Sequence, residues 1–295
     1  MACSEVSHFA PSQQMEDIDQ GTLEIDVRRW TLSGEFGKKG SGPGEFNGTF
    51  GITATQPGEL AVADYWNKRV VICSTEGKLK ETILLSDRPR NVAAIPQMSM
   101  LLVVDTTKYV KVFNKNNKLD FQFPTVPLQD IDNIDVDLRS LAVKRDDTIV
   151  VGDVKRMVWT EHKPTNGELL RTVSLQIPPF YLAFDEGTDR TVVSGYEQKQ
   201  VDVTDSVGTT LSTVQPSIQD RPVTNCLAVN SGNSGLYVGV SNGWNSDGHI
   251  HLYDVDGNFL DCLAQGLTFP LGITFTSDGQ LVVADGFSVK TYRKM

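Results

Sequence analysis

The chain has 295 residues, a formal net charge of −10, 39% hydrophobic residues and four cysteines. This length supports a sizeable core in one large domain or two small ones, and the composition is that of a folded globular protein. The sequence has no apolar run of about 18 residues and no basic and apolar N-terminal signal, so we expect neither a membrane-spanning helix nor a secretion signal.

Charge is distributed unevenly along the chain. Residues 1–27 contain six acids and no Lys or Arg, residues 28–171 have a net charge of +3, and residues 172–295 have a net charge of −7. Only the middle of the chain can present a basic surface, and the overall acidity argues against a protein dominated by phosphate contacts. The widely spaced cysteines form no CxxC pair, which predicts free and mostly buried thiols in a reduced, cytoplasmic protein.

The N-terminal region divides into two parts. Residues 1–21 are polar, acidic and without pattern, which predicts a flexible tail ahead of a single domain spanning 22–295. VRRWTLSG at 27–34 then resembles a β-strand that has no neighbouring strand of its own.

A short apolar run recurs six times after this segment, with a mean spacing of about 44 residues. The copies are LAVAD (60–64), LLVVD (101–105), IVVGD (149–153), TVVSG (191–195), LYVGV (236–240) and LVVAD (281–285). A period of about 40–45 residues is typical of a β-propeller, in which each repeat forms a four-stranded blade.

Further strands surround each copy. A first strand precedes it (50–55, 91–95, 139–143, 181–185, 225–229 and 271–275), and an alternating third strand follows it (70–74, 110–114, 157–161, 201–205, 250–254 and 289–293). Five copies continue into a fourth strand, but the chain ends after the third strand of the sixth. We expect residues 27–34 to pair with Ser288–Arg293 and supply it, because an open ring would expose unpaired strand edges. The prediction is an all-β, six-bladed β-propeller closed by an N-terminal strand.

Two segments resemble a known repeat. FGKKGSGPGEFNGTFGIT (36–53) followed by LAVADYWNKRVVICSTEGK (60–78) is similar to the NHL repeat, and FPLGITFTSDGQLVVADGFSVKTY (269–292) matches it more loosely. The resemblance extends to the C-terminal NHL domains of tripartite-motif (TRIM-NHL) ubiquitin ligases and covers about residues 27–295. Thr49 stands where the repeat has proline, and Gly195 stands where it has aspartate. The chain contains no RING pattern of Cys and His pairs, so any ligase activity would belong to another part of a parent protein.

Carboxylates and histidines are the candidate catalytic or metal-binding residues of this sequence. Aspartates end four of the second strands, and we interpret them as caps that accept hydrogen bonds from the following turns: Asp64, Asp105, Asp153 and Asp285. His249 and His251 should project to one side of a strand, but a zinc site needs a third ligand, and no other histidine lies in a comparable position. No nucleophile elbow, phosphate-binding loop or Cys/His pair is present. We therefore expect no catalysis, no cofactor and no metal.

The remaining candidate is one face of the disc, formed by the loops between second and third strands and the segments that lead into first strands. Its expected residues are Tyr65, Trp66, Lys68, Arg88, Arg90, Lys108, Tyr109, Arg139, Lys155, Arg156, Tyr181, Trp244, Asn245 and Phe287. Arg69 is expected to be structural. The TRIM-NHL resemblance implies a recognition module that binds a protein partner or ubiquitination substrate, here as a monomeric domain. Single-stranded RNA is the alternative ligand, since aromatic rings can stack on bases while Arg and Lys contact phosphates.

Overall fold

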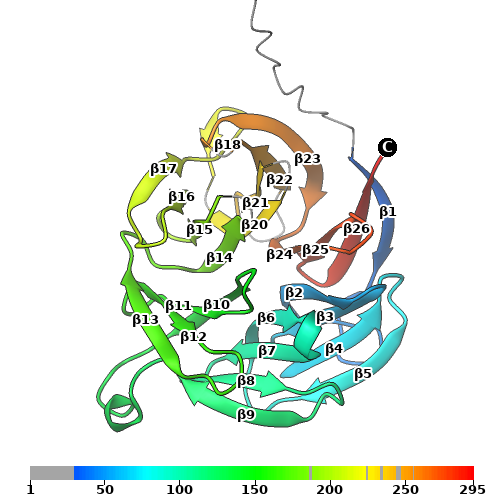
Figure 1. Ribbon diagram of the computed structural model, residues 1–295. Coiled ribbons are helices and arrows are strands. Elements are labelled where there is room, and N and C mark those ends of the chain that lie inside the picture. The colour runs from blue at the N-terminus through cyan, green and yellow to red at the C-terminus, as the bar shows by residue number, and fades with distance from the viewer. Residues whose placement is uncertain (1–29, 186–187, 224, 233–234, 244–246, 255) are drawn as a thin grey trace, which may run out of the picture.

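The structure is a computed structural model that describes residues 30–185, 188–223, 225–232, 235–243, 247–254 and 256–295. These residues form six four-stranded antiparallel sheets arranged around a central channel (Figure 1). The prediction of an all-β, six-bladed propeller is confirmed. The predicted tail at 1–21 lies outside the described residues.

Each blade runs from an inner first strand to an outer fourth strand. Blade one contains β2 (Thr49–Gln56), β3 (Glu59–Asp64), β4 (Arg69–Ser74) and β5 (Leu79–Leu84). Blade two contains β6 (Pro89–Ile95), β7 (Met100–Asp105), β8 (Tyr109–Phe113) and β9 (Leu119–Pro124). Blade three contains β10 (Leu138–Val143), β11 (Ile149–Asp153), β12 (Val158–His162) and β13 (Leu169–Ser174).

The second half of the ring repeats this order. Blade four contains β14 (Tyr181–Asp185), β15 (Arg190–Gly195), β16 (Gln200–Thr204) and β17 (Thr210–Val214). Blade five contains β20 (Asn225–Gly232), β21 (Gly235–Ser241), β22 (Gly248–Tyr253) and β23 (Phe259–Leu267). Blade six contains β24 (Pro270–Phe275), β25 (Leu281–Asp285), β26 (Ser288–Lys294) and, as its fourth strand, β1 (Trp30–Phe36).

Three short elements lie between these strands. They are the 3₁₀ helices η1 (Pro96–Met98) and η2 (Leu128–Asp130) and a small hairpin formed by β18 (Ser217–Ile218) and β19 (Arg221–Pro222). Among the described residues, no helix has the length and apolarity needed to cross a membrane.

The N-terminal strand closes the ring. β1 pairs antiparallel with β26, from Trp30 opposite Lys294 to Phe36 opposite Val289, with an irregularity between Leu32 and Gly34. The predicted closing strand is thus confirmed, although it ends two residues later than the sequence pattern indicated. Figure 1 shows the first and last strands side by side at the rim of blade six. The pairing removes the free edge that β26 would otherwise expose.

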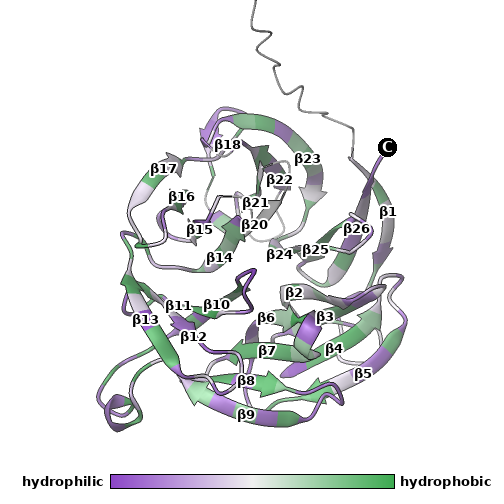
Figure 2. Cartoon of the chain, viewed as in Figure 1, coloured by the Kyte–Doolittle hydropathy of each residue, from purple (hydrophilic) through white to green (hydrophobic). Residues whose placement is uncertain are grey.

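The core lies between neighbouring blades. Six clusters of buried side chains each join one blade to the next around the ring. Trp159 of blade three, for example, is fully buried against Leu182 and Val193 of blade four. Apolar residues run along strands such as β4, β7 and β8, whereas the outer strands mix apolar and polar residues (Figure 2). Inner strands therefore hold the disc together, and loops and outer strands meet solvent.

Candidate functional site

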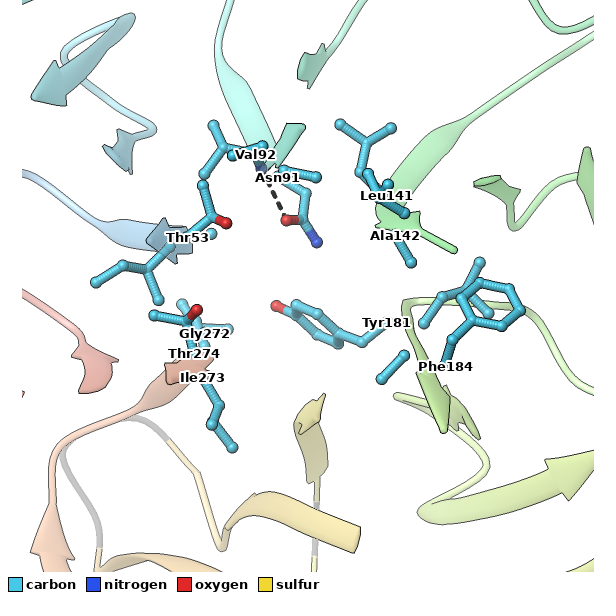
Figure 3. A pocket seen from close by; sticks show the side chains of 18 residues that line it. Thr53, Asn91, Val92, Leu141, Ala142, Tyr181, Phe184, Gly272, Ile273 and Thr274 are labelled. Carbon is cyan, nitrogen blue, oxygen red and sulfur yellow. Dashed lines mark hydrogen bonds between the residues drawn. The ribbon is translucent and has the colours of Figure 1, made fainter. Parts of the chain in front are cut away.

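A polar cavity occupies the centre of the disc. It has a volume of about 290 Å³ and is lined by residues of the first strands of five blades, β2, β6, β10, β14 and β24. The Tyr181 ring points into it, with Thr53, Asn91 and Thr274 around it (Figure 3). The Asn91 side-chain oxygen accepts a hydrogen bond from the Val92 N–H at 2.7 Å, so its amide nitrogen remains available to a ligand. Burial raises the pKa of the Tyr181 phenol, which keeps it a neutral hydrogen-bond donor.

The aspartates that end the second strands are structural, and Asp105 and Asp153 accept from N–H groups of the following turn, as predicted. For Asp64 and Asp285 the prediction was wrong, because their backbone N–H donors lie in the segments that lead into the first strands of the same blades. All four are at most 1% exposed. Asp153 accepts hydrogen bonds from the N–H groups of Asp137, Lys155 and Arg156, at 3.1 to 3.3 Å. Asp285 accepts from Thr268 and Phe269 N–H groups and contacts Lys290. Asp105 caps Thr107 and pairs with Lys111. Their oxygens are used within separate blades, so they do not converge on one cation.

Asp64 anchors the loop of the face that carries the exposed Trp66. It accepts hydrogen bonds from the Asn47 N–H at 2.7 Å, the Asn67 amide at 2.8 Å and the Arg69 Nε at 2.8 Å. Arg69 also donates to the carbonyls of residues 41, 42 and 45, in the segment that joins blade six to blade one. Arg69 is therefore structural, as expected, and the network fixes both ends of the loop that carries Trp66.

An aromatic group surrounds that loop. The Phe50 and Tyr65 rings stack at 4.3 Å, and Tyr65 meets Trp66 edge-on at 5.0 Å. The Arg88 guanidinium lies 4.3 Å from the centre of the Trp66 ring, which is half exposed. Lys68 donates to the Ser86 carbonyl at 2.9 Å, so the loop before β4 and the loop before β6 lie at the same end of the blade. This is the arrangement expected from the sequence.

A second aromatic group lies at the start of blade four. Phe180 and Tyr196 are 5.3 Å apart, and the Arg139 guanidinium lies 5.2 Å from the Phe180 ring. Phe50, Tyr181 and Tyr196 all pack against Phe269 and Leu271 of blade six, which connects the two groups across the mouth of the cavity. We define the channel-mouth face as these partly exposed aromatic residues and their cations: Phe50, Tyr65, Trp66, Phe180, Tyr181, Tyr196, Arg88 and Arg139.

Most of the predicted basic residues are already paired. Arg90 and Arg139 both bind Asp137. Lys155 lies 3.2 Å from Asp135, and Arg156 pairs with Asp153. The other three predicted basic residues, Lys68, Arg88 and Lys108, have no carboxylate partner among the described residues: Arg88 contacts two rings, and the two lysines donate to backbone carbonyls. The basic sector is therefore largely neutralised by acids from its own loops.

The other predicted residues have varied surroundings. Lys108 donates to the carbonyls of Ile131 and Ile134 at 2.6 and 3.2 Å. Tyr109 packs against the core between blades two and three. The Phe287 ring lies 5.1 Å below the Lys39 ammonium group. Trp244 and Asn245 lie outside the described residues.

The structure also brings together a group that the sequence analysis did not assemble. Cys262 on β23 lies beside His249 and His251 on β22. Cys73 and Cys226 are buried free thiols as predicted, whereas Cys262 is partly exposed. The remaining described histidine, His162, bonds to the Gly167 carbonyl and the Thr160 hydroxyl and has a structural role. The alternating His-Ile-His pattern was a signal for two of these three residues, but no sequence rule pointed to Cys262.

Comparison with known proteins shows the fold alone. No protein-family model matches the chain, and no curated protein matches its sequence. A structure of streptogramin B lyase has a TM-score of 0.62 at 12% identity, over 90% of this chain and 97% of that one. A Bacteroides thetaiotaomicron VPI-5482 protein of unknown function has a TM-score of 0.66 at 12% identity, over 90% of this chain and 76% of that one. The chain is thus similar in architecture to these proteins.

Proposed function

We propose that the channel-mouth face binds a protein partner and that the propeller is a non-catalytic recognition module. The observation that carries this proposal is the half-exposed Trp66, held between Tyr65 and Arg88 by the buried Asp64 network. Trp, Tyr and Arg are the residues that most often dominate binding energy at protein interfaces. A pre-positioned anchor also loses little side-chain entropy when a partner binds.

The cavity beside this anchor supplies polar recognition. Asn91, Tyr181, Thr53 and Thr274 offer donors and acceptors within an opening bounded by aromatic residues. A pocket with an apolar rim and a few converging polar groups fits a peptide segment whose backbone or side chain enters the channel. The proposed ligand is therefore a protein segment with an apolar or aromatic anchor residue and a polar residue nearby.

Single-stranded RNA is the less favoured ligand. Affinity for nucleic acid depends on cations that are free to neutralise phosphates. Arg90, Arg139, Lys155 and Arg156 already contact carboxylates. Releasing them would break existing ion pairs, whereas a protein partner can use the aromatic groups without disturbing those pairs.

The NHL resemblance gives this binding activity a cellular setting. In a TRIM-NHL type of protein, the propeller would select cytoplasmic substrates for ubiquitination by a RING domain outside this chain. This setting rests on the motifs in residues 36–78 and 269–292. The channel-mouth face would then determine which substrate is presented.

Peptide selection tests the proposal. Peptides from a random display library are enriched on the immobilised protein, and their Kd is measured by calorimetry for wild type, Trp66→Ala and Leu211→Ala. Leu211 is an exposed residue of the outer strand β17 and serves as the matched control. Trp66→Ala should weaken binding about 30-fold, the equivalent of a hot spot of about 2 kcal/mol, and Leu211→Ala should leave it unchanged.

An RNA titration separates the two ligand classes. Fluorescence anisotropy with a pool of short single-stranded RNAs, at low and near-physiological salt, should show weak binding that is lost as salt rises. Selective RNA binding that survives salt, together with peptides that are insensitive to Trp66→Ala, would refute the proposed function.

A further inference from the structure

The outer half of blade five gathers three metal-binding side chains. β22 and β23 pair antiparallel with His251 directly opposite Cys262, and the register shifts between Ile250 and His251. Cross-strand partners share one face of a sheet, and residues two apart on a strand do as well, so His249 joins them. One ligand atom from each of these three residues lies within 4.8 Å of the other two.

Two of the three spacings between these atoms are close to those of a tetrahedral metal site, and the third is at most 4.8 Å. His249 Nδ1 lies 3.3 Å from His251 Nε2 and 3.7 Å from Cys262 Sγ. Zinc binds imidazole nitrogen at about 2.0–2.1 Å and thiolate sulfur at about 2.3 Å, and tetrahedral angles then place two nitrogens about 3.3 Å apart and nitrogen and sulfur about 3.6 Å apart. Both distances are thus already close to those of a zinc site.

Neighbouring groups orient the two imidazoles. The Asp247 Oδ2 atom lies 2.9 Å from His249 Nε2, within ion-pair distance although the Nε2–H bond is not aligned with it. The Tyr253 hydroxyl lies 3.2 Å from His251 Nδ1. Each outer nitrogen therefore has a polar neighbour, and His249 Nδ1 and His251 Nε2 are left facing each other beside the sulfur. Carboxylates and other polar groups behind ligating histidines are a regular feature of metal sites.

The sulfur also has polar neighbours: the Ala264 carbonyl oxygen, which accepts from the thiol at 3.6 Å, and the Gln265 amide, which suits a thiolate ligand. The Gln265 amide donates to Cys262 Sγ at 3.4 Å, which stabilises negative charge on sulfur. Phe259 packs edge-on against the His251 ring at 5.3 Å and covers one side of the group. Cys262 is partly exposed, so an ion can reach the site from solvent.

A catalytic cysteine is the competing interpretation. Asp247 contacts His249 and His249 contacts Cys262, which is the order of carboxylate, imidazole and thiol in a nucleophile triad. Such a cysteine needs one imidazole as its base, and His249 Nδ1, 3.7 Å from Cys262 Sγ, is the imidazole in position for it. A triad also leaves His251 without a role, although its Nε2 faces the same point. Two imidazole nitrogens and one sulfur within 4.8 Å of one another favour a metal.

We propose that His249, His251 and Cys262 bind one zinc ion, with water in the fourth position. Imidazole and thiolate ligands select zinc and similar transition metals over calcium or magnesium. Binding transfers the thiol proton of Cys262 to solvent and ties the third strand of blade five to its fourth. The site lies on β22 and β23, away from the first strands that line the channel, so it stabilises the blade and is independent of the proposed partner face.

Cobalt substitution tests this proposal on the full, tag-free chain after treatment with a chelator. Wild type and the control Cys73→Ala should each bind one Co²⁺, with the visible bands of tetrahedral cobalt and a thiolate-to-cobalt charge-transfer band. Cys262→Ser should lose the charge-transfer band. Asp247→Asn changes a half-exposed residue, so the fold should persist while the metal affinity falls about 10–100-fold.

Three results would overturn the proposal. The first is wild-type protein that binds no stoichiometric Co²⁺. The second is a charge-transfer band that persists in Cys262→Ser. The third is alkylation of Cys262 by iodoacetamide that is far faster than that of free glutathione at the same pH and unaffected by added Zn²⁺, which would indicate the nucleophile instead. Expected instead are slow alkylation, protection by Zn²⁺ and a higher melting temperature with Zn²⁺ present.

Discussion

Substituting Asp64 by Ala tests how the Trp66 loop is held. The Asp64 carboxylate is fully buried and accepts from Asn47, Asn67 and Arg69. Removing one partner of a buried ion pair costs about 3–5 kcal/mol, because the remaining charge and donors lose their acceptor. Arg69 keeps three carbonyl acceptors, so we expect the lower end, about 3 kcal/mol. For a domain of this size this loss lowers the melting temperature by about 6 °C.

Urea denaturation of four proteins measures this cost. Wild type, Asp64→Ala, Arg69→Met and the double variant form a mutant cycle, with exposed Asp120→Ala as the control. The cycle should show a coupling of about 2 kcal/mol between Asp64 and Arg69, and the control should change stability by less than about 0.5 kcal/mol. A loss below about 1 kcal/mol in Asp64→Ala, or no coupling, would refute the role assigned to this network.

Further predictions concern ring closure, acid stability and blade packing. Deleting residues 1–36 removes β1 and should cause aggregation in size-exclusion chromatography, whereas deleting 1–21 should leave the melting temperature unchanged; equal behaviour of the two deletions would contradict the closure. Burial lowers the pKa of His162 from 6.5 to about 4, so the unfolded chain takes up the proton first, and the fold should lose about 3 kcal/mol as pH falls from 6.5 to 4. His162→Gln should flatten that part of the urea-measured pH profile, and an unchanged slope would assign it to other groups. Gly51→Ala places a Cβ 2.7 Å from the Asn91 Cα, so it should destabilise the protein by about 1–3 kcal/mol in the same assay, and a neutral effect would show that β2 and β6 can separate.

The sequence was sufficient to predict the architecture. The second strand of each blade is a short apolar run followed by turn residues. These runs recur regularly enough that six blades can be counted from the sequence alone, with no knowledge of side-chain contacts. Closure by 27–34 followed from the missing fourth strand, because an unpaired edge on β26 is unfavourable. The strand ends at Phe36 rather than at residue 34, since strand pairing, rather than the sequence pattern, determines where β1 ends.

The details of the candidate sites could not be predicted in the same way. Arg90 and Arg139 are separated by a blade boundary, and only the folded loop before β10 places Asp137 between them. Cys262 meets His251 through a register shift that no repeat pattern reveals. Both features depend on irregular backbone segments, and the regular spacing of the repeats does not predict where such segments occur.

Photo-crosslinking at the channel-mouth face tests the proposed function most directly. A photoreactive amino acid replaces Glu197, the exposed residue after Tyr196, and the matched control carries it at Leu211 on the outer strand of the same blade. After irradiation in cells that express the protein, position 197 should yield a discrete protein adduct that resists nuclease and disappears in Trp66→Ala, whereas position 211 should not yield it. A nuclease-sensitive adduct at position 197, or identical adducts from both positions, would contradict the proposal that this face binds a protein.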